Sequence, residues 1–422
     1  MMRFVLHTNT ISPHQLPLAR EIAANVGEEN FRYVYTEVAD KDHGGLGWSL
    51  DVPEWCVHAD AADVDEWLDG ADILLSGLRC FDLFERRAKK GLKNFYMTER
   101  WLKPPIGIAR LLHPRYFGYE WRLCRMMESG AFIGLPIGVH AARDMARLCG
   151  LMHGDVRCLF SVPEIDFEMR PGGRLVVSRQ SLVDRRESLV ASRQSLVGSG
   201  DKYCLGRMRM WGYFVEPSNL TTNDQRLTTN TLKVLWVGRM LDWKRVDTII
   251  RAVKSLVVSR ETQVVSRQSL VVSGDGRESL VVNGDAWQVA FDIYGAGPEE
   301  PCLKKLADTY GDIIKFHPPV PIVEVRKLMR EHDVYVLSSN GYEGWGAVVS
   351  EALEEGMKVI GTYEAGSSAT MLSDEDLFHA GDWRRLAELI ARCASEKCEG
   401  KLVGQGIGEW TAGNAGALVV GR

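Results

Sequence analysis

The stretch TLKVLWVGRMLDWKRVDTIIRAVKSL, residues 231–256, decides how this chain is expected to fold. Its first part is a run of apolar and β-branched residues, which predicts a buried strand, and VDTIIRAVKSL has its apolar residues at helical spacing. The same strand-and-helix unit recurs along the following sequence, where the further strand candidates are VAFDIYGAG, IIKFHPP, VYVLSS and KVIGT. Strands that alternate with helices favour a parallel sheet covered by helices on both faces.

A similar alternation occupies the first half of the chain, although it is less regular. The strand candidates there are FVLH, FRYVYTEV and ADILLSGL, and the helix candidates are LPLAREIAANV and GVHAARDMARLCG, the latter ending at Gly150. The polar, turn-rich segment 212–230 predicts a linker. The expected fold class is therefore α/β, with two Rossmann-like, doubly wound parallel-sheet domains at 1–215 and 231–400.

Short repeats interrupt both domains. SRQSLV begins at positions 178, 192 and 266, and RESLV begins at 186 and 277. Their uneven spacing does not fit a solenoid. We interpret them as insertions of repetitive sequence into two surface loops, about 172–200 and 257–286, because loop-closure entropy tolerates such length well.

Composition limits the kinds of partner. The 422 residues carry a formal net charge of -5, which gives no electrostatic reason to expect nucleic acid. The nine cysteines are scattered without a C-x2-C pair, which predicts neither a zinc knuckle nor a disulfide framework and fits a reducing cytoplasm. The sequence contains no run of eighteen apolar residues, so no membrane-spanning helix is expected.

Several residues of the second half come directly after predicted strands. Gly238 and Arg239 follow VLWV, Lys244 lies five residues beyond Arg239, and Gly295 follows FDIY. The carboxyl ends of parallel strands share one edge of a sheet, where ligands bind. A rigid guanidinium fork and a mobile ammonium both suit phosphate oxygens. The plainer interpretation of Arg239 and Lys244 is an exposed basic pair at the start of a helix.

The loop after VYVLSS holds Glu343, Gly344, Trp345 and Gly346, and Glu351 follows in the helix candidate AVVSEALEEG. Glycines let a backbone approach a ligand closely, and free amides at the start of a helix attract anions. The Glu343 carboxylate can accept hydrogen bonds from hydroxyl groups. Glu351 interrupts an apolar stretch, although a solvated helix face is the ordinary position of a glutamate.

Cations, glycine amides and two separated carboxylates together match a ligand in which a diphosphate joins two sugars. A nucleotide sugar has that form. The cations and amides would hold the diphosphate, one carboxylate would hold the ribose hydroxyls, and the other would hold the transferred sugar.

The second half also resembles a known family. The E-x7-E pattern from Glu343 to Glu351, with GRMLDWKRVDTIIRA, YGAGPEE and LFHAGDWRRLAELI, is similar to the retaining glycosyltransferases of family four (glycosyl transferases group one, GT-B fold). The likeness covers 231–395 and keeps the order of the motifs. It implies that the two domains face each other across a cleft. EWTAGNAGALV, in the tail 401–422, resembles the helix that crosses back to the first domain.

The resemblance implies a function and a set of site residues. The chain would transfer a sugar from a UDP- or GDP-sugar to a glycan or lipid-linked acceptor, with retention of anomeric configuration and no required cofactor. Arg239 and Lys244 would bind the diphosphate, Glu343 the transferred sugar, and Glu351 the ribose. The remaining donor contacts would be the Gly344–Gly346 amides and Val320, which would lie near the base.

The first domain departs from the family pattern. Its first loop, NTISPHQLP, lacks the glycine pair of many members. His14 is a candidate replacement near the leaving phosphate, although a capping or surface histidine is more common. Among Glu99, Arg100 and His140 the sequence does not choose a further catalytic group. No D-x-D motif follows a strand, so no metal is expected.

Two other functions and one surface are left open. A nicotinamide-dependent oxidoreductase would need G-x-G-x-x-G after a strand, and Gly295-Ala-Gly297 lacks the third glycine. A non-catalytic descendant of the family would retain the fold and sugar binding. The segment 100–127 mixes basic and aromatic residues, which fits peripheral contact with the inner face of a membrane or, in our preferred interpretation, a partly buried helix pair.

Overall fold

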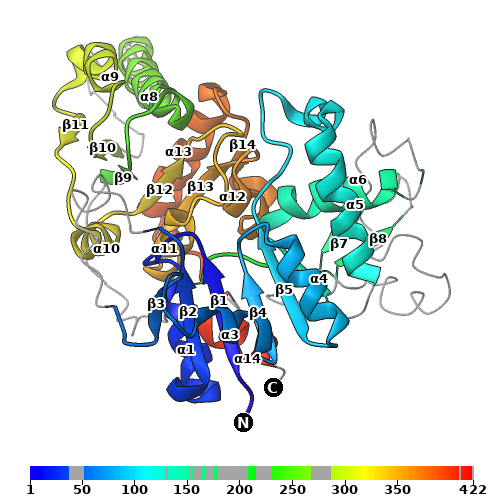
Figure 1. Ribbon diagram of the computed structural model, residues 1–422. Helices are drawn as coiled ribbons and strands as arrows, with labels where there is room; N and C mark the ends of the chain where they lie inside the picture. The colour runs from blue at the N-terminus through cyan, green and yellow to red at the C-terminus, as the bar shows by residue number, and fades with distance from the viewer. Residues whose placement is uncertain are drawn as a thin grey trace, which may run out of the picture. The chain divides into compact units, whose positions relative to one another are not determined.

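The computed structural model describes residues 1–37, 52–128, 132–152, 154, 164–167, 175–178, 208, 210–214, 231–267, 287–407 and 410–420. These residues form two compact units (Figure 1). The first unit holds the described residues up to 214 and those from 410 onward, and the second holds those from 231 to 407.

A parallel sheet of six strands forms the centre of the first unit, in the order β3-β2-β1-β4-β5-β6. The strands are β1 Phe4–Thr8, β2 Phe31–Tyr35, β3 Cys56–His58, β4 Ile73–Ser76, β5 Lys93–Thr98 and β6 Phe132–Pro136. The main helices are α1 Leu16–Val26, α3 Val64–Gly70, α4 Phe81–Lys89, α5 Pro114–Glu128, α6 Gly138–Met152 and α14 Ala412–Val420. The last helix, α14, packs against α1, so the end of the chain belongs to the first unit.

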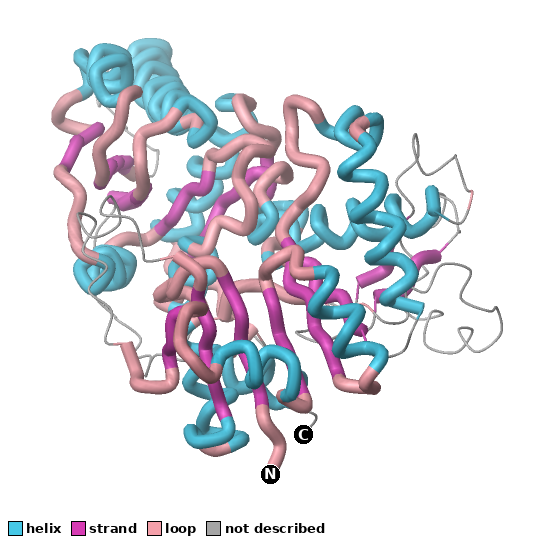
Figure 2. The backbone as a smooth tube through the Cα atoms, in the orientation of Figure 1, coloured by secondary structure: helices cyan, strands magenta, loops and turns pink. Residues whose placement is uncertain are grey.

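The second unit repeats this architecture, with the strand order β11-β10-β9-β12-β13-β14. The strands are β9 Thr231–Val237, β10 Gln288–Tyr294, β11 Ile314–His317, β12 Val334–Leu337, β13 Lys358–Thr362 and β14 Leu377–Phe378. The helices are α8 Val246–Arg267, α9 Glu300–Ala307, α10 Ile322–Glu331, α11 Val348–Glu354, α12 Gly366–Met371 and α13 Trp383–Cys398. Figure 2 shows these strands and the helices around them by secondary structure.

The composition of β9 explains its central place in that sheet. Val234 and Trp236 pack into the core on one face, whereas Leu235 packs into the core on the other. A strand that is covered on both faces must be apolar along its whole length, which is why LKVLWV is nearly continuous in hydrophobic residues. Parallel pairing of β9 with β10 and with β12 completes its hydrogen bonding.

Two predicted helix ends are wrong. The predicted stop at Gly150 does not occur, because α6 continues to Met152 with Gly150 buried inside it. The helix expected to end near residue 256 continues to Arg267, so α8 includes the start of the second repeat segment. In both places a local signal for a loop gave way to continued backbone hydrogen bonding along the helix.

The first repeat segment contributes one strand to the described structure. Strand β8, Leu175–Ser178, pairs antiparallel with β7, Glu164–Phe167. The remaining repeat residues, 172–174, 179–200 and 268–286, lie outside the described residues, as does most of the expected linker.

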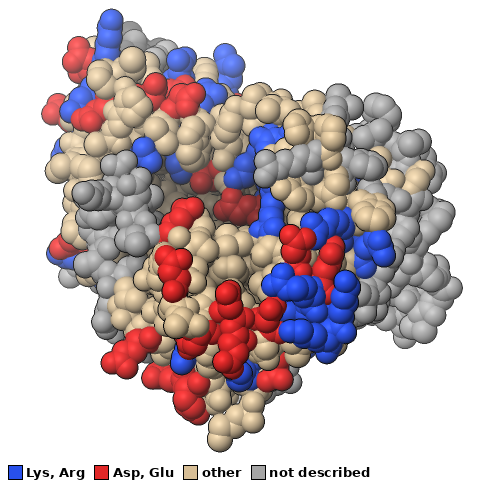
Figure 3. All heavy atoms as spheres, viewed as in Figure 1, with Lys and Arg blue, Asp and Glu red and all other residues tan. Residues whose placement is uncertain are grey.

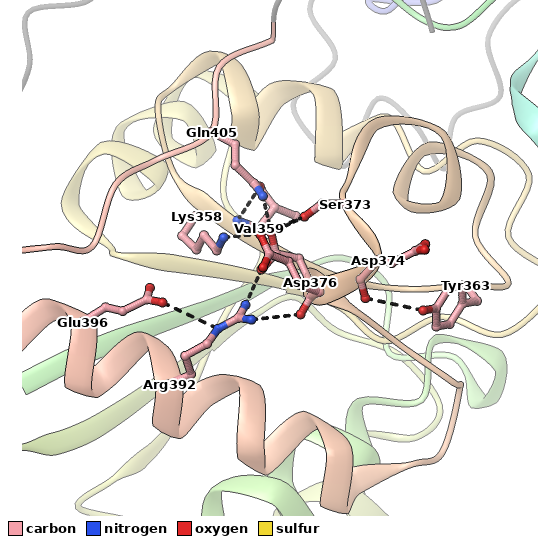
Figure 4. Close-up of polar contacts among 10 residues, drawn as sticks. Lys358, Val359, Tyr363, Ser373, Asp374, Asp376, Arg392, Glu396 and Gln405 are labelled. Atoms are coloured by element: carbon pink, nitrogen blue, oxygen red, sulfur yellow. Dashed lines mark hydrogen bonds and ion pairs between the residues drawn. The ribbon is translucent and has the colours of Figure 1, made fainter. Parts of the chain in front are cut away.

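A buried carboxylate joins the end of the second unit to its sheet (Figure 4). Asp376 is fully buried beside β14 and accepts hydrogen bonds from Lys358 at 2.7 Å and from Arg392 at 2.5 Å. Gln405, in the segment that follows α13, donates a third bond to the same carboxylate. These contacts hold β13, α13 and residues 401–407 together.

No helix among the described residues is both long and apolar enough to cross a membrane.

Candidate active site

The candidate site of the second unit lies where the order of its strands reverses. From β9 the chain proceeds to β10 and β11 on one side, and later returns to β12, which pairs with the opposite edge of β9. In such sheets the loops after the two central strands separate and leave room for a ligand at the carboxyl ends. The loop after β9 carries Gly238, Arg239 and Lys244, and the loop after β12 carries Glu343.

The loops after β9 and β10 pack backbone against backbone. The amide of Gly238 donates to the carbonyl of Tyr294 at 3.0 Å, and the amide of Met240 donates to that of Ala296 at 2.9 Å. Gly295 has a φ of 146°, and a Cβ there would lie 1.9 Å from the carbonyl oxygen of Gly238. A Cβ at Gly297 would lie 2.4 Å from the carbonyl oxygen of Met240. These glycines therefore permit close approach of two loops, and this contact fixes the segment that carries Arg239.

Lys244 and Glu343 form an ion pair across the switch point. The Nζ atom of Lys244 lies 2.5 Å from Oε2 of Glu343, and only 18% and 11% of the two side chains are exposed. The same carboxylate oxygen accepts a bond from the hydroxyl of Ser339 at 2.8 Å. The Trp243 ring lies 4.3 Å from the ammonium nitrogen, which adds a cation–π contact.

Backbone contacts fix the two loops that carry this pair. The Ser338 hydroxyl donates to the carbonyl of Lys244 at 2.7 Å, and the Asn340 amide donates to that of Trp243 at 2.9 Å. Thr362, at the end of β13, donates to the carbonyl of Ser339 at 2.6 Å. None of these hydroxyl groups was predicted from the sequence. Their shared signal is a Ser or Thr at the carboxyl end of a buried strand.

Arg239 differs from Lys244 in its surroundings. Its side chain is exposed, and it forms no ion pair or hydrogen bond with any residue that the structure describes. It follows β9 directly, in the segment that the glycine loop after β10 supports. A guanidinium in this position is available to an anion arriving at the carboxyl edge of the sheet.

Backbone hydrogen bonds from the start of α12 hold the Glu-Gly-Trp-Gly loop, residues 343–346, in place. The amide of Gly366 donates to the carbonyl of Gly344 at 3.1 Å, and that of Ser367 donates to the carbonyl of Trp345 at 2.8 Å. Trp345 is 1% exposed, and its indole N–H donates to Ser350. Its ring therefore belongs to the core. Gly346 has a φ of 84°, which a residue with a side chain would adopt only with strain.

Glu351 lies on α11 with only 7% of its surface exposed, which excludes the solvated helix face considered from the sequence. The charges of both site carboxylates affect the pKa of Tyr335, which lies on β12. Burial raises the pKa of the Tyr335 phenol, and the charges of Glu343 and Glu351 raise it further. The two glutamates therefore lie within electrostatic range of the same buried strand residue.

A stacked aromatic pair occupies the other side of the carboxyl edge. The rings of Tyr294 and His317 lie 4.3 Å apart with planes 12° from parallel. His317 is also 2.6 Å from Asp292, and the same carboxylate contacts His332 at 3.2 Å. Val320, three residues after β11, is partly buried against the adjoining core. Val320, which the family resemblance places near the nucleotide base, thus lies at the same edge of the sheet as Gly295.

The candidate residues of the first unit follow β1 and β5. The ring centroid of His14 lies 6.2 Å from that of Tyr213, whose hydroxyl donates to Glu99 at 3.4 Å. Arg100 contacts Asp144 of α6 at 3.5 Å. His140 lies on the same helix, four residues before Asp144. The structure therefore groups His14 with Glu99 through Tyr213, and Arg100 with α6.

The described residues contain no group of three or more His, Cys, Asp or Glu side chains arranged to hold a metal ion.

Comparison with known proteins finds a family model similar to the second half of the chain. Residues 220–402 match the family model Glycosyl transferases group 1. No curated protein matches the chain in sequence. Similar solved structures include the Anabaena protein Alr3699/HepE in complex with UDP (TM-score 0.52, 13% identity, covering 100% of this chain and 95% of that chain). The apo structure of OtsA is similar as well (TM-score 0.53, 11% identity, covering 99% and 98%).

These neighbours share the architecture rather than the sequence. The predicted α/β class with two doubly wound parallel sheets is confirmed, and the sheets are those of the GT-B fold. The family model thus covers less than half of the chain, and the described residues have the GT-B fold.

Proposed function

We propose that this protein transfers a sugar from a nucleotide-diphosphate sugar to a glycan or lipid-linked acceptor, with retention of anomeric configuration. The observation that carries the proposal is the Lys244–Glu343 ion pair at the switch point of the second sheet, beside the exposed Arg239. Two separated cations and a buried carboxylate at the carboxyl ends of adjoining strands suit a ligand with both phosphate and hydroxyl groups.

Lys244 and Arg239 would stabilise the leaving nucleoside diphosphate. The lysine ammonium has three donors, and one of them meets Glu343, so two remain for phosphate oxygens. The guanidinium of Arg239 adds a planar fork. As the bond between the sugar and the diphosphate breaks, negative charge grows on the phosphate oxygen, and nearby fixed cations lower the energy of that state.

Glu343 and Glu351 would bind the two sugars of the donor. Glu343 is held by Lys244 and Ser339, and its remaining oxygen can accept from a hydroxyl of the transferred sugar. Glu351 would accept from the ribose. Supporting contacts would come from the amides of Gly344, Trp345 and Gly346, and from Gly238, Gly295 and Val320 near the diphosphate and base.

Retention requires that the acceptor arrive on the face from which the diphosphate leaves. The bond from the anomeric carbon to the phosphate oxygen breaks, and a bond to the acceptor oxygen forms on the same side. The departing phosphate oxygen takes the acceptor's proton, so the step balances without a protein nucleophile. His14 stays the candidate from the sequence for a polar group near the leaving phosphate. The proposal needs no metal and no cofactor.

The neighbours support a uridine nucleotide as the first donor to test. One solved neighbour is the Alr3699/HepE complex with UDP-glucose (TM-score 0.50, 14% identity, covering 99% of this chain and 95% of that chain). GDP-sugars form the alternative.

A cytoplasmic location, including the inner face of a membrane, belongs to the same proposal. Helix α5 exposes 48% of Trp121, with the guanidinium of Arg125 4.7 Å from its ring, a combination that suits a lipid headgroup region. Lys and Arg side chains also gather around α4, but Asp and Glu lie beside them (Figure 3). Arg122, for example, pairs with Asp82 and Glu85.

Ligand-dependent melting tests the donor assignment. The full chain is heated with UDP-glucose, a GDP-sugar or no addition, and the melting temperature should rise with one donor because a ligand that binds only the folded state stabilises it. The bound donor is then incubated with glycan and lipid-linked acceptors, and the anomeric configuration of the product is read by NMR. A rise in melting temperature without transfer or hydrolysis of the donor would favour the non-catalytic alternative. Inversion of the anomeric configuration in the product would contradict the proposed mechanism.

A further inference from the structure

Two arginines of the first unit contact the same aromatic ring. Arg79 lies in the loop between β4 and α4, and Arg110 lies in the short 3-10 helix η2, Gly107–Leu112. The guanidinium carbon of Arg79 is 5.7 Å from the centroid of the Tyr116 ring, and that of Arg110 is 6.0 Å from the same centroid. Helix α5, which carries Tyr116, packs against both α4 and η2. The packing of these elements therefore brings two positive charges to one ring.

The loop that carries Arg79 lies at the switch point of the first sheet. From β1 the chain proceeds to β2 and β3 on one side, and then returns to β4 on the other side of β1. The amide of Gly77 donates to the carbonyl of His7 at 2.9 Å, which ties this loop to β1. The amide of Leu78 donates to the Ser76 hydroxyl at 3.1 Å. In doubly wound sheets the carboxyl edge at such a point is where ligands bind.

Three aromatic rings surround the guanidinium of Arg79. Besides the Tyr116 ring, its carbon lies 5.0 Å from the centroid of Trp101 and 5.9 Å from that of Tyr119. Trp101 is 2% exposed and its indole N–H donates to the Thr98 hydroxyl, so this ring is fixed in the core. Tyr116 and Tyr119 lie one helical turn apart on α5 and are partly exposed. Partly exposed phenol rings offer both an apolar face and a hydroxyl group to a ligand.

Neither arginine has its charge neutralised. They form no ion pair with a carboxylate among the residues that the structure describes. Burial raises the pKa of the Tyr96 phenol, whereas hydrogen bonding and charge from Thr98 and Arg79 lower it. Arg110 donates to the Tyr116 hydroxyl at 3.4 Å, but its Nε is buried without a hydrogen-bond partner in the described structure. Phenols and rings attract a cation without cancelling its charge, and a buried N–H group without an acceptor is unfavourable.

We propose that Arg79 and Arg110 form, around Tyr116, a binding site for an anionic sugar of the acceptor. The guanidinium groups would bind the phosphate or carboxylate of that sugar through charge-assisted hydrogen bonds. Tyr116 and Tyr119 would pack against the C–H groups of its ring. The site rests on the proposed function in assigning this ligand to the acceptor. It narrows the acceptor class to glycans that carry a negative charge.

Titration calorimetry with the full chain tests the site. The buffer contains saturating UDP, and glucose 6-phosphate, glucuronate, glucose and inorganic phosphate are titrated separately at constant ionic strength. At least one anionic sugar should bind about tenfold or more tightly than glucose and inorganic phosphate do. Arg79→Gln and Arg110→Gln should each weaken its binding by about tenfold, the loss expected for one charge-assisted hydrogen bond. Arg86→Gln is the matched control, because Arg86 is an exposed arginine of α4 that pairs with Asp69, and its affinity should equal that of the wild type.

The outcomes distinguish the chemical groups and the two proposals. Tighter binding of glucose 6-phosphate identifies a phosphate on the acceptor sugar, and tighter binding of glucuronate identifies a carboxylate. Tyr119→Leu should weaken binding of the anionic sugar and leave binding of inorganic phosphate unchanged. Lys244→Ala should abolish donor turnover and leave sugar binding intact, so the site can stand if the donor assignment fails. No binding by the wild type, equal binding of inorganic phosphate and both anionic sugars, or unchanged affinity in folded Arg79→Gln would overturn the proposal.

Discussion

Replacement of Lys244 by alanine separates a catalytic role from a structural one. The substitution removes the ion pair with Glu343, whose Nζ–Oε2 distance is 2.5 Å, and also the contact with the Trp243 ring. Glu343 retains its bond from the Ser339 hydroxyl and has 11% of its side chain exposed. Breaking a fully buried pair costs about 3–5 kcal/mol, and partial exposure reduces the cost here to about 2 kcal/mol.

The expected effect on rate is larger. If Lys244 stabilises the leaving diphosphate, its loss removes about 3–4 kcal/mol from the transition state, or about 10²–10³-fold in turnover. A purely structural lysine would lower stability by the same 2 kcal/mol but leave the rate of the folded enzyme unchanged. The two roles therefore differ in kcat per folded molecule.

The assay measures UDP released from UDP-glucose under single-turnover conditions, alongside urea denaturation. Lys254→Ala is the control, because Lys254 also combines a hydrogen bond, to the carbonyl of Leu306, with a ring contact to Tyr310 in the same unit. Glu343→Gln and the double variant complete a cycle that measures the coupling between the pair. Turnover by folded Lys244→Ala within twofold of the wild type would refute the assigned role.

Three further predictions concern the fold. Gly295→Ala should lower the free energy of unfolding by about 3 kcal/mol or more, since the added Cβ would clash with the Gly238 carbonyl. Gly311→Ala is the control, because a Cβ there enters open space and should change the free energy of unfolding little. Urea denaturation compares the two variants, and equal effects would contradict the contact between the two loops. Asp376→Asn should lower the free energy of unfolding by about 3 kcal/mol, because it removes the buried charge that Lys358 and Arg392 share, although Arg392 keeps its contact with Glu396. A denaturation midpoint equal to that of the wild type would show that the cluster does not stabilise the fold. Burial lowers the pKa of His7 from 6.5 to about 4, so about 3 kcal/mol of stability present above pH 6.5 should be lost as the pH falls to 4. Denaturation of His7→Gln across that range should lack this component, and an unchanged pH profile would disprove the assignment.

The sequence determined the architecture because alternation is a local property. Apolar runs such as VLWV and helical spacing in VDTIIRAV depend on neighbours within a few residues, and each element needs burial on the expected faces. The order of the strands then placed Lys244 and Glu343 at one edge, because parallel strands share the direction of their carboxyl ends. The predicted ends of α6 and α8 were wrong, since the residue at which a helix ends depends on competition between local sequence signals and packing.

The roles of particular side chains depended on contacts between distant segments. Trp345 belongs to the core because α12 packs beneath its loop, and Gly295 is required by the carbonyl of Gly238, 57 residues earlier in the chain. Neither contact can be predicted from the residues that lie nearby in the sequence. The ion pair between Arg100 and Asp144, 3.5 Å apart, likewise depends on α6 packing beside the segment that follows β5. Burial and charge proximity are properties of the folded chain, since they depend on which remote groups replace water around a side chain.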